Sequence, residues 1–219
     1  MSATRKTKPD TDGPNEADYY PTPAWAVDAI VPHVLADLRL CGRPFLFDPG
    51  AGDGAILSGF LRADVDPFHL CGCELRNEAT KRCHDLGLMV STRDWLACPI
   101  RWDLKNVGVV VMNPPYGGRT NLAQQFVAAA LERVNPGASV WALLRLNWLL
   151  DGEALHGRQT WLRQGPGAPD VFALNRRPSF TGDGKADATT YAWMRWVVGA
   201  PKEVSTFRAL DCHRVERPS

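Results

Sequence analysis

The residues of this sequence that most clearly indicate a chemical function are Asn113, Pro114, Pro115 and Tyr116. They follow the apolar run 107–112, so we expect them at the C-terminal end of a buried strand, which consecutive prolines must end because proline donates no backbone hydrogen bond. The Asn113 carboxamide and the Pro114 carbonyl can both accept hydrogen bonds from one NH2 group, and the Tyr116 ring can stack on a planar base carrying that group. The motif therefore predicts chemistry at an exocyclic base nitrogen, with a simple strand ending as the alternative.

A glycine-rich turn follows an earlier predicted strand at 44–48. Its sequence, Asp-Pro-Gly-Ala-Gly-Asp-Gly, places glycines at alternate positions, which lets the backbone turn tightly and approach a ligand closely. The turn lacks the Gly-Lys-Ser/Thr of a phosphate-binding loop, and its third glycine does not fit the dinucleotide-binding spacing. The residues predicted to contact a ligand here are Asp48, Gly50, Ala51, Gly52, Asp53 and Gly54.

Two further acidic residues are expected near this turn. Glu74 ends the second predicted strand, where a carboxylate can bind both hydroxyls of a ribose. Asp94 follows a third strand region and can accept a hydrogen bond from an adenine amino group, with Trp95 as a ring neighbour, or it can instead cap a helix. Carboxylates at the ends of three successive parallel strands repel one another, so this edge favours a cationic ligand that contains adenosine, such as S-adenosylmethionine.

Strands and helices alternate from residue 44 to residue 145, which predicts right-handed crossovers and a mostly parallel sheet. The expected strands are 44–48, 68–74, a region between 89 and 96, 107–112 and 139–145, and the expected helices are 55–61, 77–86 and 122–134. A helix over 24–39, with Thr22 as N-cap and Pro23 at its first position, should be kinked or split at Pro32. The β-rich run 189–198 is expected to pair back on the sheet.

The composition is that of a folded protein of ordinary domain size. Its 219 residues predict a disordered tail at 1–17 and a single domain at 18–219, with an irregular substrate-contacting segment at about 146–190. The sequence holds no apolar run of about 18 residues and no apolar N-terminal core, so we expect neither a membrane span nor a signal peptide. Six cysteines without a C-x-x-C pair and five scattered histidines predict reduced thiols, a cytoplasmic location and no metal site.

Taken together and in order, these motifs resemble a known family. FDPGAGDG at 47–54, Glu74, DW at 94–95 and NPPY at 113–116 resemble the Rossmann-like class I S-adenosylmethionine-dependent amino-methyltransferases. The resemblance spans about residues 18–198 and implies an α/β fold, with a mostly parallel sheet of the seven-stranded type flanked by helices. It also implies S-adenosylmethionine as cofactor, contacted by the residues of the glycine-rich turn and by Glu74, Asp94, Trp95 and Asn113.

Three further segments refine this resemblance. YPTP at 20–23 resembles the N-terminal motif of N6-adenine DNA methyltransferases whose cofactor half comes first, and it implies that Tyr20, Thr22 and Pro23 lie against the methionine moiety. The segments 176–180 and 191–196 resemble small bacterial and phage-type adenine methyltransferases. The resemblance therefore implies an enzyme that methylates N6 of adenine in double-stranded DNA. It leaves three biological roles open: restriction protection, defence evasion by a phage, and regulation.

Such an enzyme must bring its target base out of the duplex. Tyr116 would then stack on one face of the flipped adenine, and Phe180 on the other, unless Phe180 is a hydrophobic plug under its loop. The residues predicted to contact phosphates are Arg145, Arg158, Arg163, Arg176 and Arg177, each of which can also be an ordinary surface arginine.

Other functions share these motifs. They include methylation of RNA N6-adenine, of DNA N4-cytosine or of a protein glutamine, and a nucleic-acid-binding subunit without activity. The arginine-rich late segment favours nucleic acid over a peptide, and the retained glycine-rich turn and Asn-Pro-Pro favour activity. Little of the chain remains for a separate recognition domain, which predicts a short recognition site, low specificity, a homodimer or a recognition partner.

Overall fold

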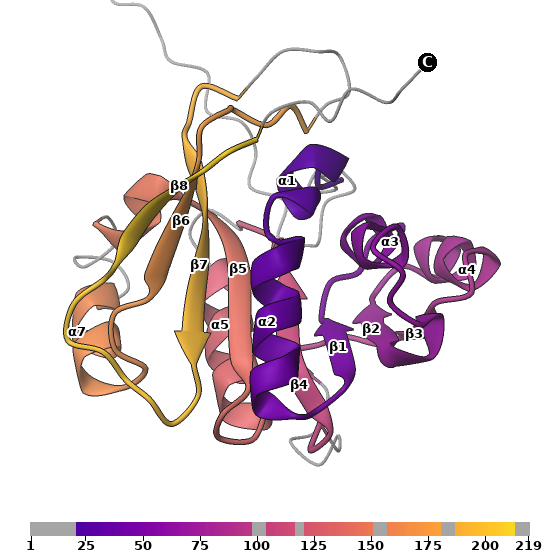
Figure 1. The fold of residues 1–219 in the computed structure, drawn as a ribbon, viewed down its shortest axis with the longest axis horizontal. Coiled ribbons are helices and arrows are strands. Elements are labelled where there is room, and N and C mark those ends of the chain that lie inside the picture. The colour runs from indigo at the N-terminus through magenta and orange to yellow at the C-terminus, as the bar shows by residue number, and fades with distance from the viewer. Residues whose placement is uncertain (1–20, 98–103, 117–120, 151–156, 181–186, 213–219) are drawn as a thin grey trace, which may run out of the picture.

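The computed structural model describes residues 21–97, 104–116, 121–150, 157–180 and 187–212. These residues form one eight-stranded sheet in the order β3-β2-β1-β4-β5-β7-β6-β8, with helices on both of its faces (Figure 1). The strands are β1 (Phe45–Asp48), β2 (Leu70–Glu74), β3 (Met89–Thr92), β4 (Val107–Met112), β5 (Ser139–Arg145), β6 (Asp170–Leu174), β7 (Tyr191–Val197) and β8 (Phe207–Leu210). The α-helices are α1 (Ala24–Asp28), α2 (Val31–Cys41), α3 (Ala55–Leu61), α4 (Asn77–Asp85), α5 (Leu122–Arg133) and α7 (Arg158–Gln164).

The predicted Rossmann-like, mostly parallel sheet is confirmed. Strands β3, β2, β1, β4 and β5 are all parallel, and β7 runs antiparallel between β5 and β6. The chain builds outward from β1 to β3 and then crosses back to add β4 on the other side of β1, so the strand order reverses at β1. In open α/β sheets a reversal of this kind opens a crevice at the carboxyl ends of the strands, where ligands bind.

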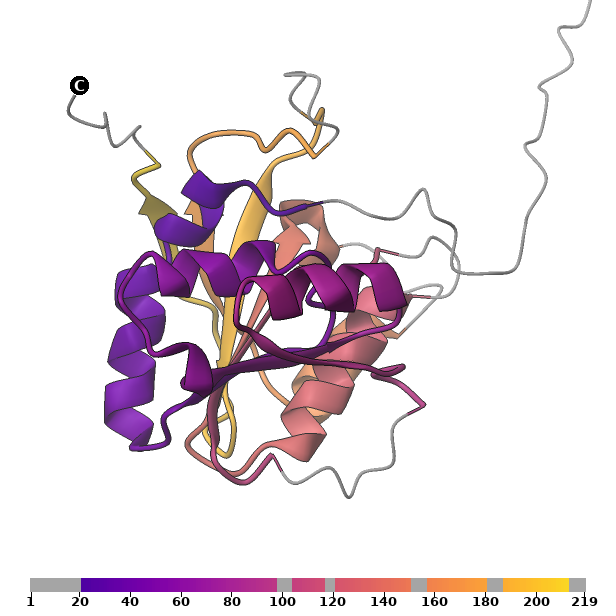
Figure 2. The same cartoon turned by 90° about the vertical axis from the view of Figure 1, so that its right-hand side faces the viewer.

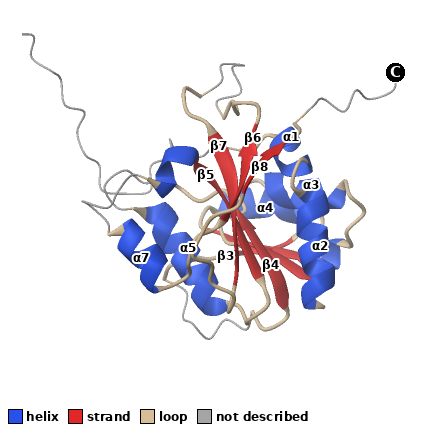
Figure 3. Cartoon of the chain, turned by 60° about the vertical axis from the view of Figure 1, so that its left-hand side comes forward, coloured by secondary structure: helices blue, strands red, loops and turns tan. Residues whose placement is uncertain are grey.

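The sheet separates two hydrophobic layers, which Figures 2 and 3 show as helices on either side of the strands. Side chains of a strand point alternately to its two faces. Val109 and Val111 of β4 therefore pack in the layer of α1, α2 and α3, whereas Val110 and Met112 pack in the layer of α5 and α7. Burial on both faces explains why β4 is an uninterrupted apolar run.

The first predicted helix is split, as Pro32 predicted. Helix α1 ends at Asp28 and α2 begins at Val31, which places Pro32 in the first turn of α2, where a missing N–H costs nothing. The predicted N-cap is wrong by one residue: Pro23 occupies that position, and no side chain caps α1. The Thr22 hydroxyl therefore has another use, which is described below.

The last three strands are where the structure adds most to the sequence. The predicted pairing of the run 189–198 is confirmed, since β7 pairs with β5 over its whole length. Segment 146–190, expected to be irregular, contains helix α7 and strand β6, and β8 adds an eighth strand beyond the expected seven.

A buried ionic cluster fixes this end of the sheet to α2. Arg195 of β7 donates hydrogen bonds to Asp37 Oδ1 at 2.6 Å and to Asp170 Oδ2 at 3.0 Å. Burial opposes the ionisation of Asp170, but hydrogen bonds from Lys202, Thr206 and Arg195 outweigh it and lower the pKa of this carboxyl. The cluster therefore stays charged, and it joins α2, β6 and β7 through one guanidinium.

Candidate active site

Two turns of the chain meet at the carboxyl edge of the parallel strands. The glycine-rich turn 49–54 leaves β1, and the segment 113–116 leaves β4. Because β1 and β4 are adjacent and parallel, both turns emerge at the same edge, where the strand order reverses. The fold thus brings together the two motifs from which the sequence predicts chemistry.

Two glycines at this edge, one in the glycine-rich turn and one on the neighbouring strand β2, are required for different reasons. Gly54 has a φ of 81°, and a Cβ at this position would lie 2.8 Å from the Leu88 Cδ1 atom. On the next strand, a Cβ at Gly72 would lie 2.4 Å from the Asp48 carbonyl oxygen. Left-handed backbone and close strand contact both exclude larger residues, so this edge stays open around the backbone of the turn.

Asp48 is the buried acid of the site. It is 1% exposed, and its Oδ1 accepts a hydrogen bond from the Gly50 N–H at 3.0 Å. Its Oδ2 is buried and has no hydrogen-bond partner among the described residues. Burial raises the pKa of this carboxyl to about 7, against the hydrogen bond from Gly50 and with a smaller contribution from the charge of Glu74.

Glu74 links the end of β2 to the glycine-rich turn. Its Oε2 accepts from the Gly52 N–H at 2.8 Å, and its Oε1 accepts from the Arg76 backbone and side chain, both at 2.9 Å. Each carboxylate oxygen can accept two hydrogen bonds, so Arg76 already fills Oε1 and only Oε2 keeps a free acceptor position. The predicted binding of both ribose hydroxyls therefore requires the Arg76 side chain to release Oε1. In the same turn, Asp53 forms an ion pair of 2.6 Å with Arg82 of α4.

Of the two residues predicted after β3, Asp94 caps the following turn and Trp95 packs in the core. Asp94 is exposed, and its Oδ1 accepts from the Leu96 N–H at 2.8 Å, which is the capping alternative noted from the sequence. Trp95 is only 2% exposed; its ring packs 5.5 Å from the Phe47 ring and 4.2 Å from the Arg133 guanidinium carbon. A ring held in the core in this way is not the open neighbour of an adenine that the sequence predicted.

Hydrogen bonds made by Asn113 and Tyr116 hold the segment after β4 in place. Asn113 Nδ2 donates to the Thr22 hydroxyl at 3.1 Å, which joins the segment to the N-terminal part of the chain. The Tyr116 hydroxyl lies 3.0 Å from Asn113 Oδ1 and 3.0 Å from the Leu143 carbonyl oxygen, and its one proton can serve either acceptor. Burial raises the pKa of Tyr116 well above its usual value, so the hydroxyl remains a neutral donor while the ring is only half-buried.

Arg145 covers part of this ring. Its guanidinium carbon lies 5.3 Å from the centre of the Tyr116 ring, and its Nε donates to the Tyr191 hydroxyl at 3.2 Å. The Tyr191 hydroxyl in turn donates to Asp187 Oδ2 at 2.8 Å. Sequence reasoning did not name Leu143, Tyr191 or Asp187 as site residues. Leu143 contributes only a backbone carbonyl, Asp187 belongs to no motif, and Tyr191 lies in a segment noted only for its resemblance.

The other predicted substrate contacts differ in exposure: two are buried and two are exposed. Phe180 is 8% exposed and packs 5.1 Å from the Tyr191 ring, in the core, which matches the hydrophobic plug rather than a free stacking face. Arg158 is 5% exposed and donates to the Trp148 carbonyl at 2.7 Å and to Asn121 Oδ1 at 2.8 Å. The predicted phosphate contact would require its guanidinium to leave these buried partners. Arg176 and Arg177 are exposed, as a phosphate contact requires.

The residues of the YPTP motif reach the site from α1. Thr22 is 6% exposed and contacts Asn113 as described, and Pro23 precedes α1. Tyr20 lies outside the described residues. The N-terminal motif and the segment after β4 are therefore in direct contact, although they are far apart in the sequence.

This edge of the sheet fits a cationic, adenosine-containing cofactor. Oδ2 of Asp48 is buried and accepts no hydrogen bond from the described residues. A positively charged group beside it would offset the cost of burying this carboxylate oxygen. Glu74, whose charge acts on Asp48 and whose Oε2 accepts from the Gly52 N–H, adds a second carboxylate that can accept from a ribose.

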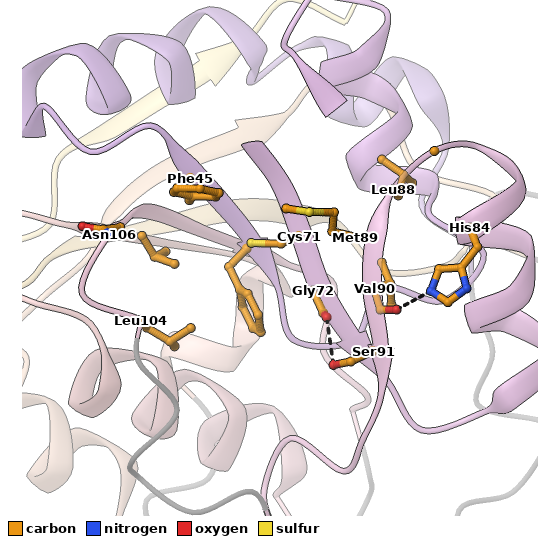
Figure 4. A pocket seen from close by; sticks show the side chains of 13 residues that line it. Phe45, Cys71, Gly72, His84, Leu88, Met89, Val90, Ser91, Leu104 and Asn106 are labelled. Carbon is orange, nitrogen blue, oxygen red and sulfur yellow. Dashed lines mark hydrogen bonds between the residues drawn. The ribbon is translucent and has the colours of Figure 1, made fainter. Parts of the chain in front are cut away.

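A separate hollow of about 780 Å³ lies on the face of β1, β2 and β3 (Figure 4). It is lined by Phe45, Cys71, Met89, Leu104 and neighbouring residues. Because Phe45, Met89 and Val107 begin their strands, the hollow extends to the amino ends of the strands, the end opposite the candidate site. Within the described residues there is no group of histidine, cysteine or acidic side chains that could hold a metal ion, and no helix long and apolar enough to cross a membrane.

Comparison with known proteins gives matches at the level of structure alone. No protein-family model matches the sequence, and no curated protein matches it. The chain superposes on a type I restriction-modification methyltransferase subunit from Streptococcus thermophilus with a TM-score of 0.67 and 15% identity, over 87% of this chain and 47% of that one. It superposes on a putative class I S-adenosylmethionine-dependent methyltransferase from Listeria monocytogenes with a TM-score of 0.62 and 14% identity, over 91% and 68%.

A third match differs in how much of the other protein is covered. A putative RNA methyltransferase from Pyrococcus horikoshii superposes with a TM-score of 0.60 and 20% identity, over 85% of this chain and 90% of that one. By contrast, the chain spans only 26% to 49% of the length of the restriction and modification proteins that it matches. At such low identities the likeness concerns the fold, and the chain has the Rossmann-like α/β fold of class I S-adenosylmethionine-dependent methyltransferases.

Proposed function

We propose that this protein is an S-adenosylmethionine-dependent methyltransferase that methylates the N6 amine of adenine in DNA. The observation that carries the proposal is the meeting of two motifs at one edge of the sheet. The Asn113 carboxamide and the half-buried Tyr116 ring leave β4 beside the turn that follows the buried Asp48. A site for a cationic cofactor and a site for an amino-bearing base are thereby adjacent.

The chemistry follows from what the residues of this segment can do. When bound, the cofactor would supply a methyl group on a sulfonium sulfur. The bond between sulfur and methyl would break as the bond to N6 forms, leaving a neutral thioether, and the methylated amine would release one proton to solvent. The N6 lone pair of adenine is delocalised into the ring, so the amine is a weak nucleophile in the free base. Hydrogen bonds from its N–H groups to Asn113 Oδ1 and the Pro114 carbonyl favour a pyramidal nitrogen, aim its lone pair and stabilise the positive charge that develops there.

The target base must leave its duplex to reach this edge. The Tyr116 ring offers a stacking face, and Arg145 has to move from that ring before a base can take the same face. The exposed Arg176 and Arg177 are suited to phosphates of the backbone. S-adenosylmethionine is held by Asp48, Gly52, Glu74 and Asp94 in this proposal.

DNA is the favoured substrate because restriction and modification proteins recur among the structural matches. The putative RNA methyltransferase, which the chain covers over nearly its whole length, supports RNA adenine as a second candidate. The described residues form one sheet with its flanking helices and no separate recognition domain. A short site, a second subunit or a partner protein would then supply the specificity.

The test is methyl transfer from radiolabelled S-adenosylmethionine to unmethylated duplex DNA, followed by mass spectrometry of the nucleosides. We expect N6-methyladenine with the wild type and none with Asn113→Ala. Asn135→Ala is the matched control, because Asn135 lies in the turn before β5 and donates to Lys105 instead. N4-methylcytosine would change the base and keep the chemistry, whereas transfer to RNA alone, or to neither nucleic acid, would refute the assignment to DNA.

A further inference from the structure

The Thr22 hydroxyl lies where it can orient the amide that the proposed reaction uses. It accepts a hydrogen bond of 3.1 Å from Asn113 Nδ2, and Thr22 is 6% exposed. The sequence predicts that this hydroxyl caps α1, yet no side chain caps that helix. The hydroxyl thus contacts the segment after β4 rather than the helix that it precedes.

Helix α1 is fixed firmly enough to hold Thr22 in place. On one side the Trp193 indole of β7 donates to the Ala26 carbonyl at 2.9 Å, and both residues are fully buried. On the other side α1 packs against α3 at Gly59, where a Cβ would lie only 2.4 Å from a methyl carbon of Val27. Helix α1 is therefore held between β7 and α3. Thr22, which lies just before this helix, is attached to a fixed part of the fold.

The far end of the amide has a partner that can withdraw. The Tyr116 hydroxyl lies 3.0 Å from Asn113 Oδ1 and equally 3.0 Å from the Leu143 carbonyl. The hydroxyl keeps its proton and can rotate to direct it from Asn113 Oδ1 to the Leu143 carbonyl, so it retains a hydrogen-bond partner in both positions. Oδ1 can then accept from an incoming N–H while Nδ2 stays bound to Thr22.

We propose that Thr22 is a positioning residue for Asn113. Its hydroxyl holds Asn113 Nδ2, so that Oδ1 faces the target amine. When the substrate binds, the Tyr116 hydroxyl donates to the Leu143 carbonyl instead of Oδ1. The proposal rests on the proposed function for its chemical consequence. It assigns the Thr22 hydroxyl to the substrate side of the site and leaves the predicted cofactor contact to other atoms of the N-terminal segment. A carboxamide fixed at one end reaches the target nitrogen in a single orientation.

Three variants separate orientation from cofactor binding. Thr22→Val keeps the shape of the side chain and removes the hydroxyl, whereas Thr22→Ser keeps the hydroxyl. Asn135→Ala is the control at a position away from the site. We expect Thr22→Val to lower kcat about tenfold, as the loss of one orienting hydrogen bond predicts, while the Kd of S-adenosylmethionine changes by about twofold or less. Thr22→Ser should recover kcat to within about threefold of the wild type.

A second measurement tests the hydrogen bond without any activity. In the cofactor-free protein, the side-chain amide protons of Asn113 should exchange with solvent more slowly in the wild type than in Thr22→Val. Equal exchange of these protons in the two proteins, or a Thr22→Val variant with normal kcat, would overturn the proposal. So would a variant that loses cofactor affinity but has normal kcat at saturating cofactor. If the wild type methylates no nucleic acid, the proposed function fails, whereas amide exchange still decides the positioning role.

Discussion

The buried carboxyl of Asp48 makes a prediction in which stability and function change in opposite directions. Its pKa of about 7 lies some three units above the ordinary value of 3.8, because burial without a partner for Oδ2 disfavours the charge. At 1.36 kcal/mol per unit, ionising this group in the folded protein costs about 4 kcal/mol. Asp48→Asn has nearly the same shape and carries no charge, so it removes that cost.

The sign follows from proton binding. Between pH 4 and pH 7 the unfolded chain has lost this proton and the folded protein still holds it, so the contribution of Asp48 to stability falls as pH rises through this window. The full penalty is present above pH 7. Asparagine brings a buried N–H group without a partner, which costs about 1–3 kcal/mol, so the net gain at pH 8 should be roughly 1–3 kcal/mol. For a protein of this size that corresponds to a rise in Tm of roughly 2–12 °C.

Cofactor binding should respond in the opposite way. If the ionised carboxylate is the form that pairs with a cationic cofactor, the ionised fraction rises about eightfold between pH 6 and pH 7.5 for a pKa of about 7, and the Kd of S-adenosylmethionine should fall by the same factor. Asp48→Asn should bind more weakly and lose this dependence.

Thermal unfolding at pH 5 and pH 8, with titration calorimetry across pH 6–7.5, measures both effects. Asp85→Asn, an exposed change at the end of α4, is the control and should alter neither. A lower Tm for Asp48→Asn at pH 8, or an unchanged pH dependence of binding, would refute this account of the carboxyl.

Three further predictions concern residues away from that carboxyl. Arg195→Ala leaves two buried carboxylates without their shared guanidinium and should cost about 3–5 kcal/mol in the free energy of unfolding, as measured by urea denaturation; a loss below about 1 kcal/mol would mean that the cluster contributes little. Arg176→Ala and Arg177→Ala should each lower the slope of log affinity for DNA against log salt by about 1 and leave the Tm unchanged, whereas an unaltered slope would exclude phosphate contacts. Phe180→Ala should cost about 3 kcal/mol of stability because the ring is buried; a stable variant with a raised KM for DNA would instead restore the stacking role predicted from the sequence.

The sequence predicts most of the fold because its local patterns agree with the tertiary structure. Alternation of strands and helices places β1, β4, β5, α3 and α5 within a residue or two of their observed bounds. The pattern has little to say about β6 and β8. Strand β8 is largely exposed at the edge of the sheet, and β6 lies in a segment that its glycines, prolines and arginines marked as irregular.

In the candidate site, the success of a prediction depends on what fixes the direction of the side chain. Side chains whose position is set by the backbone at the end of a strand, such as Asp48, Glu74 and Asn113, lie at the predicted edge because strand direction and register place them there. The predictions that fail or need revision concern large side chains, whose direction depends on neighbours that no local pattern reveals. Trp95 turns into the core beside Phe47, and its indole also finds an acceptor there.

Arg158 shows why a positive charge in the sequence is a poor guide to a binding surface. A guanidinium carries five N–H donors on a long apolar stem, so it can satisfy itself inside the protein wherever carbonyls and amides converge. Around Arg158 the backbone of the 3₁₀ turn at Leu146–Leu149 and the start of α5 provide such acceptors, and the Trp148 ring lies 4.3 Å from the guanidinium carbon. The arginines that remain exposed, Arg176 and Arg177, lie just after β6, where the polar loop offers fewer buried acceptors. Nucleic-acid contacts are therefore better sought among arginines that the fold leaves in solvent than among all those that one stretch of sequence contains.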